Sequence, residues 1–353
     1  MEIKHITEKY SILKNHTKPQ PFGQGHINDT YLVEASGVEY ILQRVNGKVF
    51  NTPVLTSNLN FLFDALSEYE NKNGKKLTPA ILKNDEGNFH TIDNEGYAWR
   101  LMEFFPGCNS YAISPSTEIS YKAAKAVGEF QLFLNQLHVN DFDDTIKDFH
   151  NTPGRLETFL NTVKKASPSL VEQAATEIQF VKQNHFIACR IEELSDDGTL
   201  PRRITHNDTK LDNILFTQNS GVIIIDLDTV MPGYIMYDYG DMVRTFTSPA
   251  KEDEQDINKT VLRIEHFKAL TKGYLEPLKN HLTATEKESL LLGAKAIIYE
   301  QIIRFLNDFL LGNIYYKTAY PTHNLIRTRT QIRLLEDILS REKELQQIIN
   351  NEL

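Results

Sequence analysis

The chain has 353 residues, of which 41% are hydrophobic and 24% are charged, so it can bury a core large enough for two lobes. Its formal net charge of −9 argues against nucleic-acid binding as the main role, because a phosphate backbone needs a basic surface. The two cysteines lack metal-ligand spacing, which predicts free thiols. The sequence shows no secretory signal and no apolar run of about 18 residues, so we expect a cytoplasmic protein without a membrane segment.

Residues 1–105 are predicted to form a strand-rich N-terminal lobe that carries one helix. Strands are expected at residues 30–33, 39–44, 88–92 and 97–105. The sequence Ala-Ser-Gly at residues 35–37 predicts that the first two strands form a hairpin. Apolar residues recur at spacings of three and four over residues 54–69, which indicates an amphipathic helix.

Residues 106–353 are predicted to form a larger, mainly helical C-terminal lobe, and Pro106-Gly107 marks the boundary. Helices are expected at residues 116–137, 153–166, 169–190, 252–274, 285–311 and 324–350. Residues 198–227 interrupt this pattern with short apolar strands and turn residues. The fold class that follows is α+β and bilobal, with a small antiparallel sheet in the first lobe.

One stretch of polar residues between short apolar runs carries the most chemical information. His206, Asp208, Lys210 and Asn213 follow the spacing His-x-Asp-x-Lys-x-x-Asn, and a strand, a turn and a second strand then lead to Asp226. Phosphoryl transfer needs these residue types, because one carboxylate must hold the acceptor hydroxyl while another carboxylate and an amide oxygen hold Mg²⁺. We therefore predict Asp208 as the base and Asn213 and Asp226 as magnesium ligands. Lys210 would offset charge on the transferred phosphoryl group.

Each of these residues alone would indicate only a loop, since His, Asn and Asp are common in turns and helix caps. The full pattern of four polar identities, followed by strand, turn, strand and aspartate, is much more specific. His206 is expected to orient the loop through hydrogen bonds rather than to take part in the chemistry.

A second signal precedes the predicted hairpin, where Gly23 and Gly25 let backbone amides approach phosphate oxygens. Asn28 stands where a third glycine would complete a GxGxxG pattern, so the segment alone also fits an ordinary loop. On the following strand, Arg44 is predicted to hold the α- and β-phosphates, although strand alternation leaves Gln43 open. A solvated arginine at a strand end is the alternative for Arg44.

Together these motifs resemble the aminoglycoside phosphotransferase and choline kinase superfamily, and within it the N-acetylhexosamine 1-kinases. The resemblance extends over nearly the whole chain. It rests on these segments: GQGHIND at 23–29, YILQRVNGKVFNTP at 40–53, DFHNTPGRLETF at 148–159, THNDTKLDNILF at 205–216, IDLDTVMPGYIMYDYGDMVR at 225–244, RFLNDFLLGNIYYKT at 304–318 and HNLIRTRTQ at 323–331. It implies a protein-kinase-like fold that uses ATP and Mg²⁺ to phosphorylate the anomeric hydroxyl of N-acetylglucosamine or N-acetylgalactosamine.

The resemblance also implies roles for residues outside the central loop. Asp228 would share the role of base or magnesium ligand, and adenine would contact backbone near residues 102–105, which places Glu103 and Phe105 at the nucleotide. The sugar would contact Asp208 and five further side chains: His26, Arg304, Tyr315, Asp238 and Asp241. Asp238 and Asp241 could alternatively be carboxylates that support the loop.

Several alternatives stay open at this point. The same fold serves kinases for choline, ethanolamine, aminoglycosides or other sugars, but cationic acceptors need acidic and aromatic cages, which Arg304 disfavours. A pseudokinase that only binds ligands is a third possibility, against which the intact Asp208, Asn213 and Asp226 speak. The expected partners are a sugar and a nucleotide, and the sequence does not distinguish ATP from GTP. We expect no nucleic acid or membrane partner, and a monomer is favoured.

Overall fold

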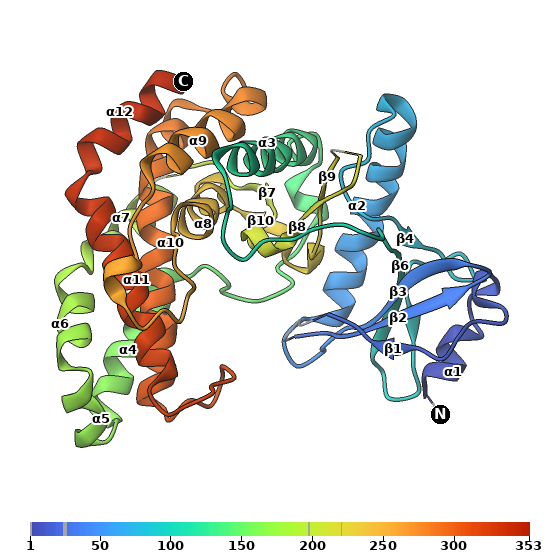
Figure 1. Cartoon of the computed structure of the whole chain (residues 1–353), viewed down its shortest axis with the longest axis horizontal. Helices are drawn as coiled ribbons and strands as arrows, with labels where there is room; N and C mark the ends of the chain where they lie inside the picture. The colour runs from blue at the N-terminus through green and yellow to red at the C-terminus, as the bar shows by residue number, and fades with distance from the viewer. Residues whose placement is uncertain (1, 24–26, 197, 220) are drawn as a thin grey trace. The chain divides into compact units, whose positions relative to one another are not determined.

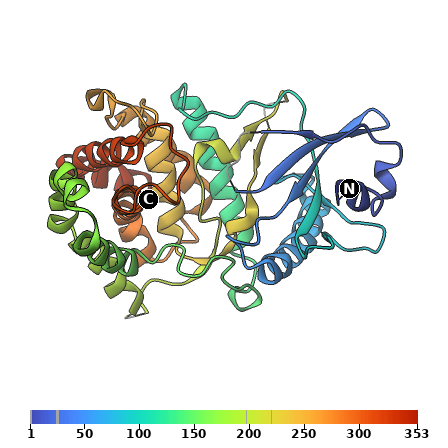
Figure 2. The same ribbon diagram turned by 90° about the horizontal axis from the view of Figure 1, so that it is seen from below.

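The computed structural model describes residues 2–23, 27–196, 198–219 and 221–353, whose secondary structure is drawn in Figures 1 and 2. The chain divides into two compact units. The first unit comprises Met1–Asn109, Leu137–Lys147 and Leu215–Pro232, and the second comprises Ser110–Gln136, Asp148–Ile214 and Gly233–Leu353. Three stretches that the sequence placed in the C-terminal lobe, residues 106–109, 137–147 and 215–232, therefore belong to the first unit. Among helices in the described ranges, none combines the length and apolar character that crossing a bilayer demands.

The first unit is built on an antiparallel sheet in the order β1-β2-β3-β6-β4, with β5 paired to β6. Its strands are β1 (Gln20–Pro21), β2 (Asp29–Ala35), β3 (Val38–Arg44), β4 (Ile81–Leu82), β5 (Thr91–Ile92) and β6 (Ala98–Glu103). The hairpin of β2 and β3 turns at Ser36 (φ 54°) and Gly37 (φ 78°), the two positive φ values that a tight hairpin turn requires. The predicted hairpin is thus confirmed.

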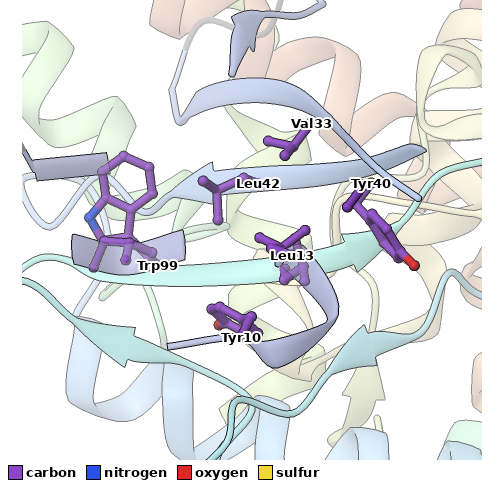
Figure 3. Close-up of a cluster of buried hydrophobic side chains, with 9 residues drawn as sticks. Tyr10, Leu13, Val33, Tyr40, Leu42 and Trp99 are labelled. Carbon is purple, nitrogen blue, oxygen red and sulfur yellow. The ribbon is translucent and has the colours of Figure 1, made fainter. Parts of the chain in front are cut away.

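One face of this sheet packs on the N-terminal helices α1 (Glu2–Thr7) and η1 (Ser11–Leu13). Alternate side chains of the central strands meet these helices in the buried cluster of Figure 3: Ile6, Tyr10, Leu13, Val33, Ala35, Tyr40, Leu42, Trp99 and Leu101. Burying one large apolar side chain of this kind contributes about 1.5–3 kcal/mol. Successive strand residues point to opposite sides, so the cross-strand pair Gln43 and Arg100 lies on the other face.

Helix α2 (Thr52–Asn73) completes the N-terminal part of the first unit and confirms the helix predicted over residues 54–69. Asn51 caps its N-terminus by accepting from the Val54 N–H, and Gly74 ends it in the left-handed conformation (φ 63°). The buried side of the helix is formed by Leu55, Asn58, Leu59, Leu62, Phe63 and Leu66. The later segments of the unit add η2 (Val139–Asp141), β9 (Val222–Ile224) and η4 (Leu227–Thr229).

The second unit is mainly helical. Its elements are α3 (Thr117–Leu134), α4 (Thr152–Lys165), α5 (Pro168–Gln173), α6 (Ala175–Gln183), α7 (Phe186–Asp196), β7 (Arg203–Thr205), η3 (Leu211–Asn213), α8 (Ile235–Thr247), η5 (Ile257–Lys259), α9 (Ile264–Leu278), α10 (Ala284–Leu310), α11 (His323–Ser340) and α12 (Glu342–Glu352). Strands β8 (Ile214–Phe216) and β10 (Met231–Gly233) run across the boundaries between the units in sequence. Helix α10 packs against α4, α8 and α11, while α3 packs against α9. These two helix groups form the core of the second unit (Figure 1).

The structure corrects several helix predictions in the second unit. The helix expected at 169–190 is three helices, because Ala174 and Asn184 have non-helical backbones. The helix expected at 324–350 breaks at Arg341 (φ −110°, ψ 15°) into α11 and α12. The helix expected at 252–274 begins only at Ile264, and α8 was not predicted at all.

Candidate functional site

The loop after β7, residues 206–213 (the catalytic loop below), begins with a strained residue that its neighbours hold in place. Asn207 has a left-handed backbone (φ 65°), which asparagine tolerates better than most residues. The Thr205 hydroxyl donates to Asn207 Oδ1 (2.9 Å), and Asn207 Nδ2 donates to the Thr205 carbonyl (3.1 Å). Such strain persists where surrounding bonds over-determine the conformation, which is common at functional sites.

Asp238 on α8 supports the catalytic loop. Its Oδ2 accepts from the His206 N–H (2.9 Å) and its Oδ1 from the Asn207 N–H (2.7 Å). The Thr209 hydroxyl donates to its carbonyl (2.7 Å). Burial raises the pKa of Asp238 to about 6, although His206 and the two backbone N–H groups act in the opposite direction. Asp238 is 1% exposed and both its oxygens accept from the loop, which favours the alternative of loop support, and its contact with a sugar hydroxyl stays a prediction.

The carboxylate of Asp208 has two donors on one of its oxygens. Lys210 Nζ and Asn213 Nδ2 both donate to Oδ2 at 2.9 Å, and Asn213 Nδ2 also reaches the Asp208 carbonyl at 2.9 Å. Burial raises the pKa of Asp208, but the charge and hydrogen bond of Lys210, with His206 and Asn213, outweigh it and lower the pKa to about 2. Asp208 is therefore ionised at neutral pH, and Oδ1 is the oxygen that an acceptor hydroxyl can approach.

Two of the predicted magnesium ligands have the chemistry that the ion requires. Asn213 uses its amide nitrogen on Asp208, which leaves its carbonyl oxygen Oδ1 for a cation. Asp226 follows β9 with a left-handed backbone (φ 62°) and supplies a carboxylate. Mg²⁺ takes one or two such oxygens from protein and completes its shell with substrate phosphates and water. The described residues contain no group of three His, Cys, Asp or Glu that could hold a metal ion by itself.

Asp228, the third predicted magnesium ligand, belongs to the first unit. It is fully buried, and its Oδ1 accepts from Arg100 Nη1 (2.5 Å) while its Oδ2 accepts from Asn28 Nδ2 (2.7 Å). The Thr145 hydroxyl donates to its backbone carbonyl (2.8 Å). Donors from the chain contact both carboxylate oxygens, which favours a structural role, and the role of Asp228 as a base or magnesium ligand stays a prediction. Asn28, which stands where a third glycine was missing, is one of these donors.

Arg44 lies on the face of the sheet opposite Gln43, the alternative that the sequence left open, and opposite Arg100. Arg44 stacks over the Tyr97 ring, 3.7 Å from its centroid, and its guanidinium faces three carboxylates: Glu95 (2.9 Å), Asp93 (3.7 Å) and Asp29 (3.8 Å). These contacts favour a structural role, and the phosphate role of Arg44 stays a prediction. Arg100, which the sequence analysis missed, donates through Nε to Gln43 Oε1 (2.9 Å) on the opposite face.

The remaining residues predicted at the nucleotide are only partly described by the structure. Gly23 has a positive φ of 76°, whereas Gly25 lies outside the described residues, as does His26, which was predicted at the sugar. Glu103 ends β6, and its Oε2 accepts from Lys76 Nζ (2.6 Å). The Lys76 ammonium also lies 5.9 Å from the centroid of the Phe105 ring. The nucleotide roles of these residues stay predictions.

Arg304 on α10 belongs to a buried charged cluster in the second unit. It lies 5.9 Å from the ring centroids of both Phe149 and Tyr316, and its Nη1 is 3.8 Å from Glu300 Oε1. Burial lowers the pKa of Arg304, but Tyr316, Glu300 and Tyr315, with a smaller effect of Asp208, outweigh it and raise the pKa. The cluster is therefore near enough to Asp208 for their charges to interact.

Glu300 is the central carboxylate of this cluster and is fully buried. It accepts from the Thr152 hydroxyl (3.0 Å), and it faces His150 Nδ1 (3.2 Å) and Arg155 Nε (3.5 Å). Sequence reasoning missed Glu300, His150 and Arg155. The last two lie in the segment 148–159 that carried the family resemblance, which was the available signal; no motif singled out Glu300.

Tyr315, predicted to cover the sugar, is 65% exposed on the loop after α10. Its backbone N–H donates to Asp308 Oδ1 (2.8 Å), and that of Tyr316 donates to Asp308 Oδ2 (3.0 Å). The side chain of Asn324 donates to the same Asp308 oxygen (2.8 Å). A buried carboxylate thus fixes the backbone of both tyrosines while leaving the Tyr315 ring accessible.

Asp241, the last predicted sugar contact, is paired within α8. Its Oδ1 accepts from Arg244 Nε (2.9 Å), and Arg244 Nη1 donates to Glu252 Oε1 (3.0 Å). Asp241 is 5% exposed. The ion pair anchors Arg244, in line with the alternative of loop support, and the contact of Asp241 with a sugar hydroxyl stays a prediction.

A carboxylate base held by a lysine and an asparagine, on a loop that a helical unit supports, is the arrangement that kinases use for phosphoryl transfer. A model of the phosphotransferase enzyme family, APH, matches residues 18–260, and the chain belongs to this family. It is accordingly an ATP-dependent small-molecule kinase, and the family alone does not define its acceptor.

Solved structures with low sequence identity share the fold. An aminoglycoside phosphotransferase from Alicyclobacillus acidocaldarius superposes with a TM-score of 0.67 at 13% identity, over 99% of this chain and 96% of its own. A microcompartment-associated aminopropanol kinase gives 0.64 at 16% identity, over 95% and 96%. Amicoumacin kinase in complex with AMP-PNP and Ca²⁺ gives 0.59 at 13% identity, over 89% and 87%. The predicted protein-kinase-like α+β fold is thus confirmed.

Proposed function

We propose that the chain transfers the γ-phosphate of ATP to the anomeric hydroxyl of an N-acetylhexosamine, giving a sugar 1-phosphate. The observation that carries this proposal is Arg304, which lies 5.9 Å from the ring centroids of both Phe149 and Tyr316 and whose pKa Asp208 helps to raise. A guanidinium group donates to sugar hydroxyls through its fork of N–H groups, and aromatic rings cover the apolar face of a sugar.

Charge disfavours the cationic acceptors of related enzymes. Choline, ethanolamine and aminoglycosides call for acidic and aromatic cages. Here two guanidinium groups, Arg155 and Arg304, both face the carboxylate of Glu300, so the cluster is poorly suited to a cation. A neutral acceptor such as an N-acetylated sugar carries no such penalty.

Each residue of the catalytic loop then has a role in the reaction. Asp208 Oδ1 accepts the proton of the anomeric hydroxyl and holds its oxygen in line with the γ-phosphorus. Lys210 offsets charge on the phosphoryl group in transfer. Asn213 Oδ1 and Asp226 would hold Mg²⁺, which supplies positive charge to the phosphate oxygens. The family resemblance further assigns nucleotide contacts to Gly23, Gly25, Glu103 and Phe105, and sugar contacts to His26 and Tyr315.

The test is an acceptor panel with Mg·ATP, in which phosphorus NMR identifies the phosphorylated position. The panel contains N-acetylglucosamine, N-acetylgalactosamine, glucose, galactose, choline, ethanolamine and an aminoglycoside. A 1-phosphate formed chiefly from the N-acetylhexosamines supports the proposal. Turnover confined to the amines, or phosphorylation at another hydroxyl, would discard the sugar site and keep the kinase chemistry.

A pair of arginine variants tests the site itself. Arg304→Lys keeps one positive charge but loses the planar fork, so the KM for sugar should rise by about 10-fold or more while the KM for Mg·ATP stays constant. Arg190→Met, at an exposed arginine on α7 that pairs with Glu193, is the control and should leave both constants unchanged. An unchanged KM for sugar in Arg304→Lys would remove Arg304 from the site.

A further inference from the structure

The ring of His150 lies between two acceptors. Its Nδ1 is 3.2 Å from the Glu300 carboxylate, and its Nε2 is 3.0 Å from the carbonyl oxygen of Asn207. A neutral imidazole carries one N–H and leaves its other nitrogen as an acceptor. Because a carboxylate and a carbonyl both accept, a neutral ring would set one nitrogen lone pair against an oxygen lone pair. Only the doubly protonated ring satisfies both contacts.

The charges around His150 are compatible with this state. From α10, Glu300 and Arg304 face the ring, and Arg155 lies on α4. From α8, Asp238 and Tyr237 face it. The Tyr237 ring centroid is 4.7 Å from that of His150, and the Tyr237 hydroxyl donates to the His150 carbonyl. His206 and Asp208 belong to the catalytic loop on the Asn207 side.

The charge states of the two partners reinforce each other. Burial raises the pKa of Glu300, but His150, Arg155 and Arg304 outweigh it and lower the pKa to about 2, so the carboxylate is ionised. Burial lowers the pKa of His150, but the charge and hydrogen bond of Glu300 and the Asn207 carbonyl outweigh it and raise the pKa.

His150 contacts two parts of the second unit that must be correctly placed for the reaction: the Glu300 cluster and the catalytic loop. On one side, Glu300 accepts a hydrogen bond from the Thr152 hydroxyl and faces Arg155 and Arg304, the cations of the proposed acceptor site. On the other side, the Asn207 carbonyl belongs to the peptide bond that leads directly into Asp208. A shift of the His150 ring would move both the guanidinium side and the base.

We propose that His150 is a positioning residue, held as an imidazolium, that couples the Glu300–Arg304 cluster to the orientation of Asp208. The acceptor side of this coupling rests on the proposed function. The charge state of the ring and its bond to the catalytic loop do not, because they follow from the Glu300 and Asn207 contacts alone.

The first test is a histidine NMR titration of the whole protein from pH 5 to 9, using ¹⁵N-labelled rings. We expect both nitrogens of His150 to stay protonated above about pH 6.5, the ordinary midpoint of histidine. Glu300→Gln should lower the pKa of His150 by about 1–3 units, the effect of removing an opposite charge at this range. His185, an exposed ring in the same unit, is the internal reference and should not respond to Glu300→Gln. A neutral His150 ring at pH 6.5 would overturn the proposal.

The second test is kinetic and uses whichever acceptor the panel identifies. Glutamine offers one donor and one acceptor, so His150→Gln cannot serve both contacts, and kcat should fall by about 10- to 100-fold, as for a small misplacement of a catalytic group. The KM for Mg·ATP should stay constant. His185→Gln is the matched control and should match the wild type. Wild-type kcat in His150→Gln would overturn the coupling.

A pH profile separates positioning from a merely structural role. The wild-type kcat should decline as pH rises through the raised pKa of His150, and Glu300→Gln should move this decline to lower pH. The same alkaline limb in both proteins would overturn the role of the imidazolium. If His150→Gln does not fold, the titration of the wild-type ring still decides the charge state. If the N-acetylhexosamines are not substrates but His150 is an imidazolium, the proposed function fails and this inference stands.

Discussion

At the scale of single residues, two carboxylates that contact the same loop have been given different proton affinities by their surroundings. Lys210 and Asn213 hold the pKa of Asp208 at about 2, whereas burial raises that of Asp238 to about 6. Titratable groups pushed apart in this way mark a division of roles. Asp208 is ionised throughout the working range and is a weak base, which suits a reaction in which positioning matters more than proton affinity.

Asp208→Asn tests the role of the base with the least change of shape. The amide cannot accept the hydroxyl proton, so kcat should fall by about 10²- to 10⁴-fold, the usual contribution of general base catalysis. Binding of Mg·ATP, measured by calorimetry, should be preserved because Asp208 is not among the proposed magnesium ligands. Turnover equal to wild type would remove Asp208 as the base.

Asp238 predicts a pH dependence that Asp208 cannot produce. Only its ionised form offers two acceptor oxygens to the N–H groups of His206 and Asn207. Protonation, with a pKa of about 6, should therefore loosen the catalytic loop, and kcat should decline below about pH 6. Folding stability should move the other way: a raised carboxylate pKa adds stability below the unfolded value of about 3.9, and this contribution is lost as pH rises through about 6.

The measurement is kcat at saturating Mg·ATP and acceptor between pH 5 and 8, with the melting temperature recorded in the same buffers. The melting temperature separates loosening of the loop from acid unfolding. A constant kcat down to pH 5 would contradict the link between Asp238 and the loop, and a melting temperature that falls together with kcat would assign the decline to unfolding.

At the scale of elements, the sequence predicted those whose pattern is local. The β2–β3 hairpin was predicted from its turn residues. Helix α2 was predicted from its apolar spacing, and a capping residue and a terminal glycine mark its two ends. Helix α8 also carries a periodic pattern, with polar residues at Asp238, Asp241 and Arg244. The helix was missed because these aspartates were considered only as a motif, and their burial becomes visible only in the folded chain.

The contrast between local patterns and contacts made only in the folded chain also explains which site residues the sequence revealed. Asp208, Lys210 and Asn213 lie within six positions and form a readable pattern. Arg100 was missed because its partner Asp228 is 128 residues away, and strand polarity alone did not show which face Arg44 would take. The contacts of Asp228 were hidden for the same reason: its two donors lie on distant parts of the chain and become visible only after folding.

Helix packing in the second unit predicts a sharp cost at one glycine. Helices α8 and α10 approach so closely that a Cβ on Gly240 would lie 2.3 Å from the carbonyl oxygen of Gly293. That neighbour is backbone and cannot rotate away, so Gly240→Ala must push the helices apart. Overpacking of this kind costs about 1–3 kcal/mol or more, and it outweighs the gain in helix propensity of about 1 kcal/mol.

Chemical denaturation followed by circular dichroism measures this cost. The control is Glu288→Ala, which places an alanine at an exposed position of α10. The control should leave the midpoint of unfolding within about 0.5 kcal/mol of wild type, as surface substitutions usually do. A Gly240→Ala protein as stable as the control would show that the two helices can separate without loss.

At the scale of the whole molecule, the first unit is not a continuous piece of chain. Its sheet comes from the first 109 residues, but Leu137–Lys147 and Leu215–Pro232 return to it. The returning segments make specific contacts: Ile224 donates its N–H to the Leu77 carbonyl (2.9 Å), and Asn109 forms a β-bridge with Phe216. A boundary drawn at Pro106-Gly107 would cut these contacts away from the sheet.

The buried pair of Arg100 and Asp228 makes this discontinuity costly. A fragment of residues 1–109 keeps Arg100 but loses Asp228, and breaking a buried ion pair by removing one partner costs about 3–5 kcal/mol. That is a large part of the roughly 5–15 kcal/mol that stabilises a typical domain. We therefore expect the fragment not to fold cooperatively, whatever its sequence suggests about an independent N-terminal lobe.

Trp99 provides the readout, because it is the single tryptophan of the chain and is buried beside Leu101 and Tyr31 in the sheet. In the fragment, its fluorescence should resemble that of the denatured chain and show no cooperative transition in urea. Arg100→Leu in the same fragment removes the unpaired charge and should restore part of the protection of Trp99. Equal exposure of Trp99 in the two fragments would assign the defect to the lost backbone contacts, and a cooperatively folded 1–109 would show that the returning segments are dispensable.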